Sequence, residues 1–153
     1  MIGPRRYASW ALLVLTVLIG LFGLGDVLIG PPFDPGIALG LTGRTHAQLQ
    51  AESAAGYRLL DYYTRAGGIE LIVIAVATTL ILLIPYRQGR PWAWWAMWLV
   101  PAWAIGGFAL NLAFGVASGE TPPPPMISAP ILAAVAAVAL LVDRERFRAA
   151  TPA

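Results

Sequence analysis

The sequence predicts an all-α integral membrane protein, a single domain of four antiparallel helices with both ends of the chain in the cytoplasm. Composition is the first observation behind this prediction. Of the 153 residues, 58% are hydrophobic and 12% are charged, about half the charged share of a typical soluble domain. The second is that four apolar stretches reach the roughly 17 to 25 residues that a helix needs to cross a bilayer.

The predicted spans cover residues 10–29, 67–84, 92–116 and 126–142. The fourth is short, and Pro130 falls in its first turn, where a missing N–H is tolerated. Pro101 is expected to kink the third span, because it leaves a backbone carbonyl without its helical partner. Residues 85–91 are too few for anything but a tight turn, so the second and third spans should be antiparallel neighbours.

The distribution of arginine gives the orientation, since positive charge gathers in cytoplasmic connections. Three arginines fall on one side of the predicted spans: Arg44, Arg58 and Arg65. Seven fall on the other: Arg5, Arg6, Arg87, Arg90, Arg144, Arg146 and Arg148. This bias predicts a multi-pass protein of the plasma membrane with cytoplasmic termini. A tryptophan cluster beginning at Trp92 supports a cytoplasmic interface at the start of the third span.

The first outer loop, residues 30–66, is long and opens with prolines that break helix. Within it, residues 45–63 are predicted to form a surface helix that Gly56 interrupts. The second outer loop contains four prolines at 122–125, a sequence typical of stiff polyproline II structure.

Three polar residues inside the spans are the candidate site, because polar groups in a bilayer are costly and so are informative. Asp26, Glu70 and Asn111 each lie about one turn from the outer end of their helix. Each also shares a helical face with small residues, which mark the faces where membrane helices approach closely. All three are therefore expected to face the bundle interior at one depth.

On the third span the small residue on that face is Gly107, four residues before Asn111. Gly107→Leu is therefore expected to destabilise the protein, because a branched side chain would not fit a packed face.

These residues suggest binding chemistry. Asp26 and Glu70 would repel one another in a shared, partly desolvated pocket, and Arg65 near its mouth would offset part of that charge. Such a pocket suits a cationic or hydroxylated amphiphile, or proton transfer to one. A purely structural interpretation stays open: Asn111 bonds across helices, while the carboxylates reach water or pair with Arg65 and Arg58.

Several classes of function are disfavoured. The chain has no cysteine, and His46 is its only histidine, in the first outer loop. No metal site, haem or other cofactor is therefore expected. The cytoplasmic halves of the predicted spans carry no ionisable residue, which counts against an ion or proton pathway. Phosphate-loop, dinucleotide and nucleophile-elbow motifs are absent. The basic residues follow membrane topology, so no nucleic-acid partner is expected.

The sequence resembles the EXPERA family of four-helix membrane proteins, which includes sterol isomerases. The resemblance lies in Asp26 at the end of span one, Glu70 at the start of span two, and the basic-aromatic turn from Arg87 to Trp92. It implies membrane carboxylates that line a cavity for amines and sterols. The third span lacks the histidine of the isomerases. Residues 65–68 and the Trp-rich third span also resemble bacterial DoxX-like proteins.

Two functions follow as hypotheses. In the first, the protein binds a lipid or other hydrophobic amphiphile in an outward-half cavity through Asp26, Glu70, Asn111 and Arg65. No catalytic residue is assigned, and any catalysis would be an isomerase-type proton transfer. In the second, it is a non-catalytic accessory subunit of a membrane complex that docks through spans three and four.

Overall fold

The structure is a computed structural model that describes residues 4–116 and 124–148. Throughout these residues the regular structure is helical, without strands. Four helical stretches are long and apolar enough to cross a membrane, which confirms the predicted fold class at this level. They cover Tyr7–Ile29, Ala54–Tyr86, Pro91–Ala113 and Met126–Phe147. The polyproline prediction falls largely outside the described residues, and its last two prolines, Pro124 and Pro125, begin a helix.

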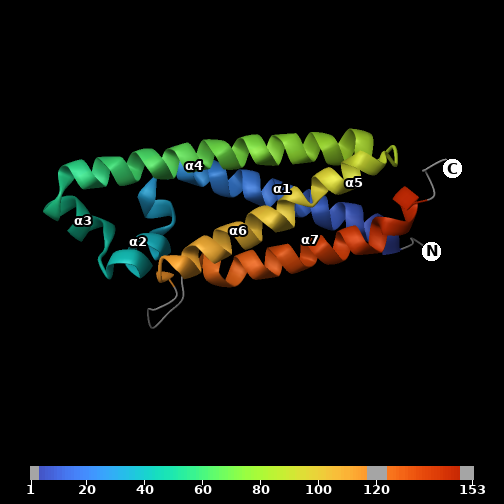
Figure 1. Ribbon diagram of the computed structural model, residues 1–153. Coiled ribbons are helices and arrows are strands. Elements are labelled where there is room, and N and C mark those ends of the chain that lie inside the picture. The colour runs from blue at the N-terminus through green and yellow to red at the C-terminus, as the bar shows by residue number, and fades with distance from the viewer. Residues whose placement is uncertain (1–3, 117–123, 149–153) are drawn as a thin grey trace.

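Figure 1 shows the helices lying side by side, with the ends of the chain together at one end of the molecule. The elements in chain order are α1 (Pro4–Ile29), η1 (Pro31–Phe33), α2 (Pro35–Thr42), α3 (His46–Glu52), α4 (Ala54–Ile81), η2 (Leu82–Tyr86), α5 (Pro91–Met97), α6 (Leu99–Ala113) and α7 (Pro124–Arg148). The short elements η1, α2 and α3 close the end opposite the termini. We call them the cap, and the two ends of the molecule the cap end and the termini end.

The cap has a different helix boundary from the predicted one. Thr45 begins α3 with a capping box in which its side chain and that of Gln48 bond each other's backbone N–H groups. Ser53 has extended backbone and accepts a hydrogen bond from the Gly56 N–H at 3.0 Å, which begins α4. The predicted interruption at Gly56 is therefore wrong. The chain breaks at Ser53, and α4 continues without a loop into the second span.

The third span is interrupted, as Pro101 predicts. Proline has no N–H to donate to the carbonyl four residues earlier, at Met97. The helix α5 ends at that residue, and α6 resumes at Leu99 after a single turn residue, Trp98. Before α5, the chain turns tightly, with Arg90 N–H bonded to the Pro85 carbonyl at 3.0 Å.

The closest helix contact in the described chain joins α1 to α4 through small residues. A Cβ added at Gly23 would lie 2.6 Å from the Gly68 carbonyl oxygen, and one added at Gly68 would lie 2.7 Å from the Gly23 carbonyl oxygen. Further along, a Cβ at Gly20 would lie 3.1 Å from Ala75 Cβ. Contacting residue numbers rise on one helix as they fall on the other, so the helices are antiparallel. Their backbones approach closely only because these residues are small.

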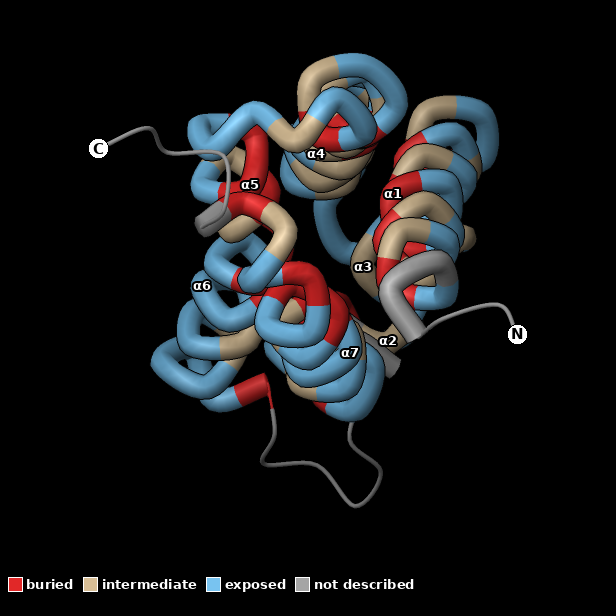
Figure 2. Tube along the Cα trace, turned by 90° about the vertical axis from the view of Figure 1, so that its right-hand side faces the viewer, coloured by how far each residue is buried: buried red, intermediate tan, exposed pale blue. Residues whose placement is uncertain are grey.

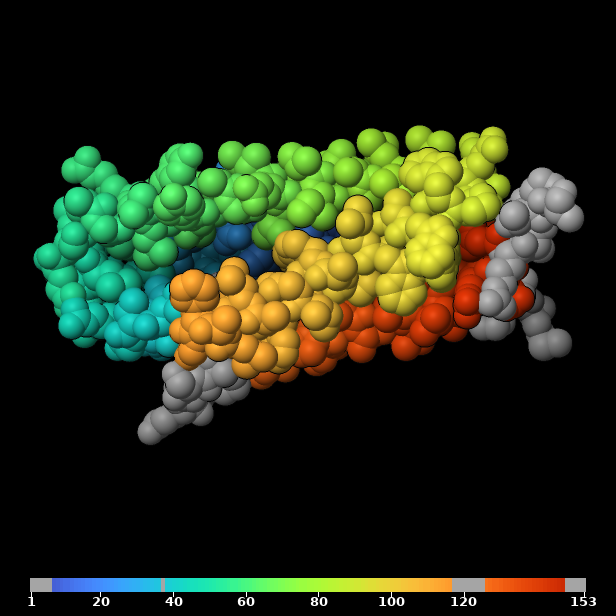
Figure 3. Space-filling view, viewed as in Figure 1, coloured from blue at the N-terminus to red at the C-terminus, as the bar shows by residue number. Residues whose placement is uncertain are grey.

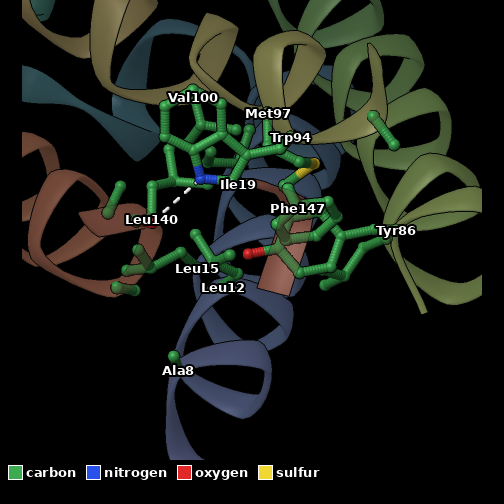
Figure 4. Close-up of a cluster of buried hydrophobic side chains, with 14 of the residues drawn as sticks. Ala8, Leu12, Leu15, Ile19, Tyr86, Trp94, Met97, Val100, Leu140 and Phe147 are labelled. Carbon is green, nitrogen blue, oxygen red and sulfur yellow. Dashed lines mark hydrogen bonds between the residues drawn. The ribbon is translucent and has the colours of Figure 1, made fainter. Parts of the chain in front are cut away.

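The hydrophobic core lies between α1, α5 and α7 at the termini end (Figures 2 and 4). Trp94 is the largest residue that joins α5 to α7: its Nε1–H donates to the Leu140 carbonyl at 2.9 Å. The alanine-rich stripe of α7 packs inward as well, because Ala133, Ala136 and Ala139 are buried. This face of the fourth span is therefore occupied within the chain.

The helices separate toward the cap. Among the described elements, α6 packs chiefly against α7, whereas α4 packs chiefly against α1. Figure 3 shows the result: a hollow between α4 and α6, with α1 visible at its bottom. We call this hollow the α4–α6 groove.

The small-residue faces of spans two and three differ from those expected. On α4 the packed glycine is Gly68, and a Cβ added at Gly67 would meet nothing within 4 Å. On α6, Gly107 likewise has open space around it. The expectation that Gly107 lies on a packed face is therefore wrong within this chain, because α7 contacts a different side of α6.

We predict that Gly23→Ala lowers the Tm in detergent, because its methyl group would force two backbones apart. Overpacking of this kind typically costs about 1–3 kcal/mol. Gly107→Ala is the matched control, since it adds the same methyl group in open space and should leave the Tm unchanged or slightly raised. Equal effects of the two substitutions would contradict the assigned α1–α4 contact.

Candidate functional site

Asp26 is the polar residue that α1 presents to the interior. It lies seven residues after Ile19, which is itself seven after Leu12, and both of these are buried core residues. At this spacing the three share one face of the helix. Asp26 is 8% exposed, and its Cβ lies against Gly68 of α4. The predicted inward orientation of Asp26 is therefore confirmed.

The other two predicted polar residues are placed differently. Asn111 is half-buried and lies seven residues after the buried Ala104, so it continues the inward face of α6. Glu70 is exposed. The small residues that predicted its orientation, Gly67 and Ala77, do not form the packed face of α4, which runs through Gly68 and Ala75 instead. The expectation that Glu70 is buried with Asp26 is therefore wrong.

Arg65 closes the end of α1. Its Nε donates to Asp61 Oδ1 at 2.9 Å, and its Nη1 donates to the Val27 carbonyl. Gly30, whose φ is 76°, follows the helix and bonds the Asp26 carbonyl through its N–H at 2.9 Å. A left-handed glycine after the last turn is a common way to end a helix. In the described contacts, Arg65 therefore stabilises a helix terminus beside Asp26.

Sequence reasoning missed two further polar residues at the cap end. Asp34 caps α2 through its carboxylate, which accepts from the Gly36 N–H at 3.3 Å. It follows Phe33, whose ring packs against Phe22 of α1 at a centroid separation of 5.2 Å, so the cap lies on the end of α1. His46, at the start of α3, is close enough to act on Asp34. Asp26, Asp34 and His46 therefore lie toward the same end of the molecule, and we call them the cap cluster.

Only some polar atoms of the cap cluster have hydrogen-bond partners in the described residues. Burial raises the pKa of the Asp34 carboxyl, while its bond from Gly36 and the charge of His46 act in the opposite direction. Both ring nitrogens of His46 are buried and have no hydrogen-bond partner in the described residues. Buried polar atoms normally have partners, so His46 could bond a polar group that enters from outside the chain. The composition of the loop gave no signal that it folds back onto Asp26.

A second buried carboxylate lies at the termini end. Asp143 is fully buried, and its Oδ2 accepts from Tyr86 Oη at 3.0 Å and from Ser9 Oγ at 3.3 Å. It joins α1, η2 and α7. The predicted fourth span ends one residue earlier, at residue 142, whereas the helix continues through Asp143 to Arg148. Asp143 continues the buried stripe of Ala136 and Leu140, so helical spacing could have revealed it.

Comparisons with known proteins add no relative. No family model, curated protein or solved structure matches the chain. In the described residues there is also no group of three histidine, cysteine or acidic side chains placed to hold a metal ion.

The raised pKa of Asp34 predicts a pH-dependent stability. The unfolded chain releases this proton near the ordinary value of 3.8, before the folded chain does. The free energy of unfolding should therefore fall as pH rises above that value. Asp34→Asn keeps a helix cap but has no proton to lose. We expect its Tm to exceed that of the native protein near pH 7, with the difference shrinking toward pH 4.

Thermal melts across this interval measure the effect, and Glu70→Gln controls for the loss of one negative charge. A difference between Asp34→Asn and the native protein that stays constant with pH, or grows on acidification, would contradict the burial of Asp34.

Proposed function

We propose that this chain is an integral membrane protein that binds a lipid or other hydrophobic amphiphile, with its apolar part in the α4–α6 groove. The observation that carries the proposal is the separation of α4 from α6 toward the cap (Figure 3). In a bilayer, a groove between two apolar helices is filled by hydrocarbon. A groove that ends at polar groups favours a molecule with a polar head over a plain acyl chain.

The polar head would meet the cap cluster. Asp26 supplies a carboxylate on the inward face of α1, and Asp34 at the start of α2 supplies a second at the same end of the molecule. The unpartnered His46 nitrogens add hydrogen-bonding capacity. Two carboxylates favour a cationic head, such as a protonated amine, or a hydroxyl group that can donate to them. Asn111 and Glu70 would act as secondary contacts, and Arg65 would hold the end of α1 beside the site.

The arginine bias supports a plasma-membrane orientation with both termini in the cytoplasm and the site in the outward half of the bilayer. The resemblance to EXPERA proteins supports the same ligand class. It also leaves a proton-transfer reaction on a hydrophobic substrate as the enzymatic form of this proposal. We assign no catalytic residue.

Binding of a fluorescent dodecylamine to the detergent-purified protein tests the proposal, with the equal-length alcohol as the second probe. We expect saturable binding of the amine and, for Asp26→Asn, a loss of roughly ten-fold or more in affinity, the order expected when a charged hydrogen bond is removed. Glu70→Gln is the matched control and should lose less, because Glu70 is exposed.

Equal losses in Asp26→Asn and Glu70→Gln would contradict the central position of Asp26. Absence of saturable binding of both probes to the native protein would remove the amphiphile proposal itself.

A second function, that of an accessory subunit in a membrane complex, is favoured by one face of α6. Ala102, Gly106, Ala109 and Ala113 recur at helical spacing, and all four are exposed. Gly106 has no atom near the position of a Cβ. The α1–α4 contact uses the same kind of small-residue face, so a partner helix could pack here. Co-purification of one polypeptide in fixed stoichiometry, lost in Gly106→Leu, would favour this function.

A further inference from the structure

The termini end of the molecule carries three arginines that form no ion pair within the described residues. Arg87 and Arg90 lie in the turn before α5, and Arg144 lies near the end of α7. All three side chains are exposed, and none forms an ion pair in the described part of the chain. By contrast, Arg44 and Arg65 at the cap end are paired with Glu52 and Asp61.

These cations are held on a preorganised surface. The Arg146 guanidinium donates to the Arg87 carbonyl, which fastens the end of α7 to the turn. That turn closes at Gly89, whose φ of 74° suits a glycine. The guanidinium groups of Arg87, Arg90 and Arg144 therefore stand on two segments whose backbones the fold holds side by side.

Aromatic side chains lie next to the cations. Trp92 and Trp95 are 56% and 68% exposed in the first turns of α5. The ring of Trp95 packs edge-on against Trp94 at a centroid separation of 4.7 Å, and Trp94 is anchored to α7. Exposed tryptophan at the end of an apolar helix is typical of the headgroup level of a bilayer. The arginines therefore lie where phosphate groups of lipids would lie.

The arginines at the termini end outnumber the acidic side chains there. Seven of the ten arginines belong to this end, and its acidic side chains in the described residues are Asp143 and Glu145. Asp143 is fully buried and already accepts hydrogen bonds from Ser9 and Tyr86. The termini end is therefore strongly positive, and its exposed cations favour an anionic partner.

We propose that Arg87, Arg90, Trp92, Trp95 and Arg144 form a binding surface for the headgroups of anionic phospholipids. Guanidinium groups bind phosphate through paired N–H donors, and the indole rings would lie among the glycerol backbones of the same lipids. This surface is at the opposite end from the cap cluster, so it does not depend on the amphiphile site.

Native mass spectrometry of the full chain in mild detergent tests the proposal, with phosphatidylglycerol and phosphatidylcholine as probes. We expect the native protein to retain phosphatidylglycerol preferentially. The double variant Arg87→Gln/Arg144→Gln should lose roughly ten- to thirty-fold in affinity for it, given the contribution of each arginine near an anionic surface. The matched control is Arg44→Gln/Arg58→Gln, which removes two cap-end charges and should keep the preference.

The Tm of each variant in phosphatidylcholine micelles shows whether the fold is retained, and a single Arg144→Gln variant replaces any double variant that is not folded. Equal loss in the two double variants would show a response to net charge alone and overturn the proposal. Unchanged retention in Arg87→Gln/Arg144→Gln would also overturn it. Displacement of the lipid by millimolar inorganic phosphate would assign the surface to a soluble anion instead.

Discussion

The contact between the backbones of α1 and α4 is the constraint on which the rest of the structure depends. Gly20, Gly23 and Gly68 let these helices lie close enough that added methyl groups would touch backbone or Cβ atoms. This contact holds α4 on α1 along most of its length, while α7 holds α6. Two helix pairs arranged in this way need not meet on every side, and the α4–α6 groove is where they do not.

Buried polar groups lie at both ends of the molecule, and they differ in the hydrogen-bond partners that they have in the described residues. At the termini end, Asp143 Oδ2 accepts from Tyr86 and Ser9, and Trp94 donates to Leu140, whereas Asp143 Oδ1 is buried without a partner in the described residues. At the cap end, the His46 nitrogens have no partner in the described residues. A buried polar group without a partner is costly in isolation. The His46 nitrogens therefore give the cap cluster unused hydrogen-bonding capacity within the described residues.

The coarse fold follows from the sequence because the signals are local. Apolar length defines four helices, and Pro101 defines the interruption of the third. The predictions of which face of each helix is buried were less accurate, because they were based on small residues alone. Glycine marks a close approach only where a partner helix is present. Gly67 is adjacent to Gly68, and Gly106 to Gly107, and the sequence does not indicate which glycine of each pair packs against another helix. Because α4 packs against α1 through Gly68 and not through Gly67, Glu70 lies on an exposed face of α4.

The parts of the candidate site that depend on tertiary structure could not be predicted. The inward orientation of Asp26 could be predicted, because this residue of an apolar helix shares a face with Gly23, which packs against α4. Asp34 and His46 lie in a loop of ordinary composition, and only the return of that loop onto α1 makes them relevant. The spacing of Asp143 from Leu140 indicates a position on the buried face of the fourth span. The arginines next to it, however, are typical of residues beyond the end of a span.

The central claim is that the α4–α6 groove holds one amphiphile whose head meets the cap cluster. Because the chain has no cysteine or known cofactor-attachment site, native mass spectrometry can read non-covalent adducts on it directly. The account predicts one amphiphile per chain that survives release from the detergent micelle and is lost in Asp26→Asn. A purified protein without adducts, or with a statistical spread of micelle lipids that Asp26→Asn leaves unchanged, would contradict it.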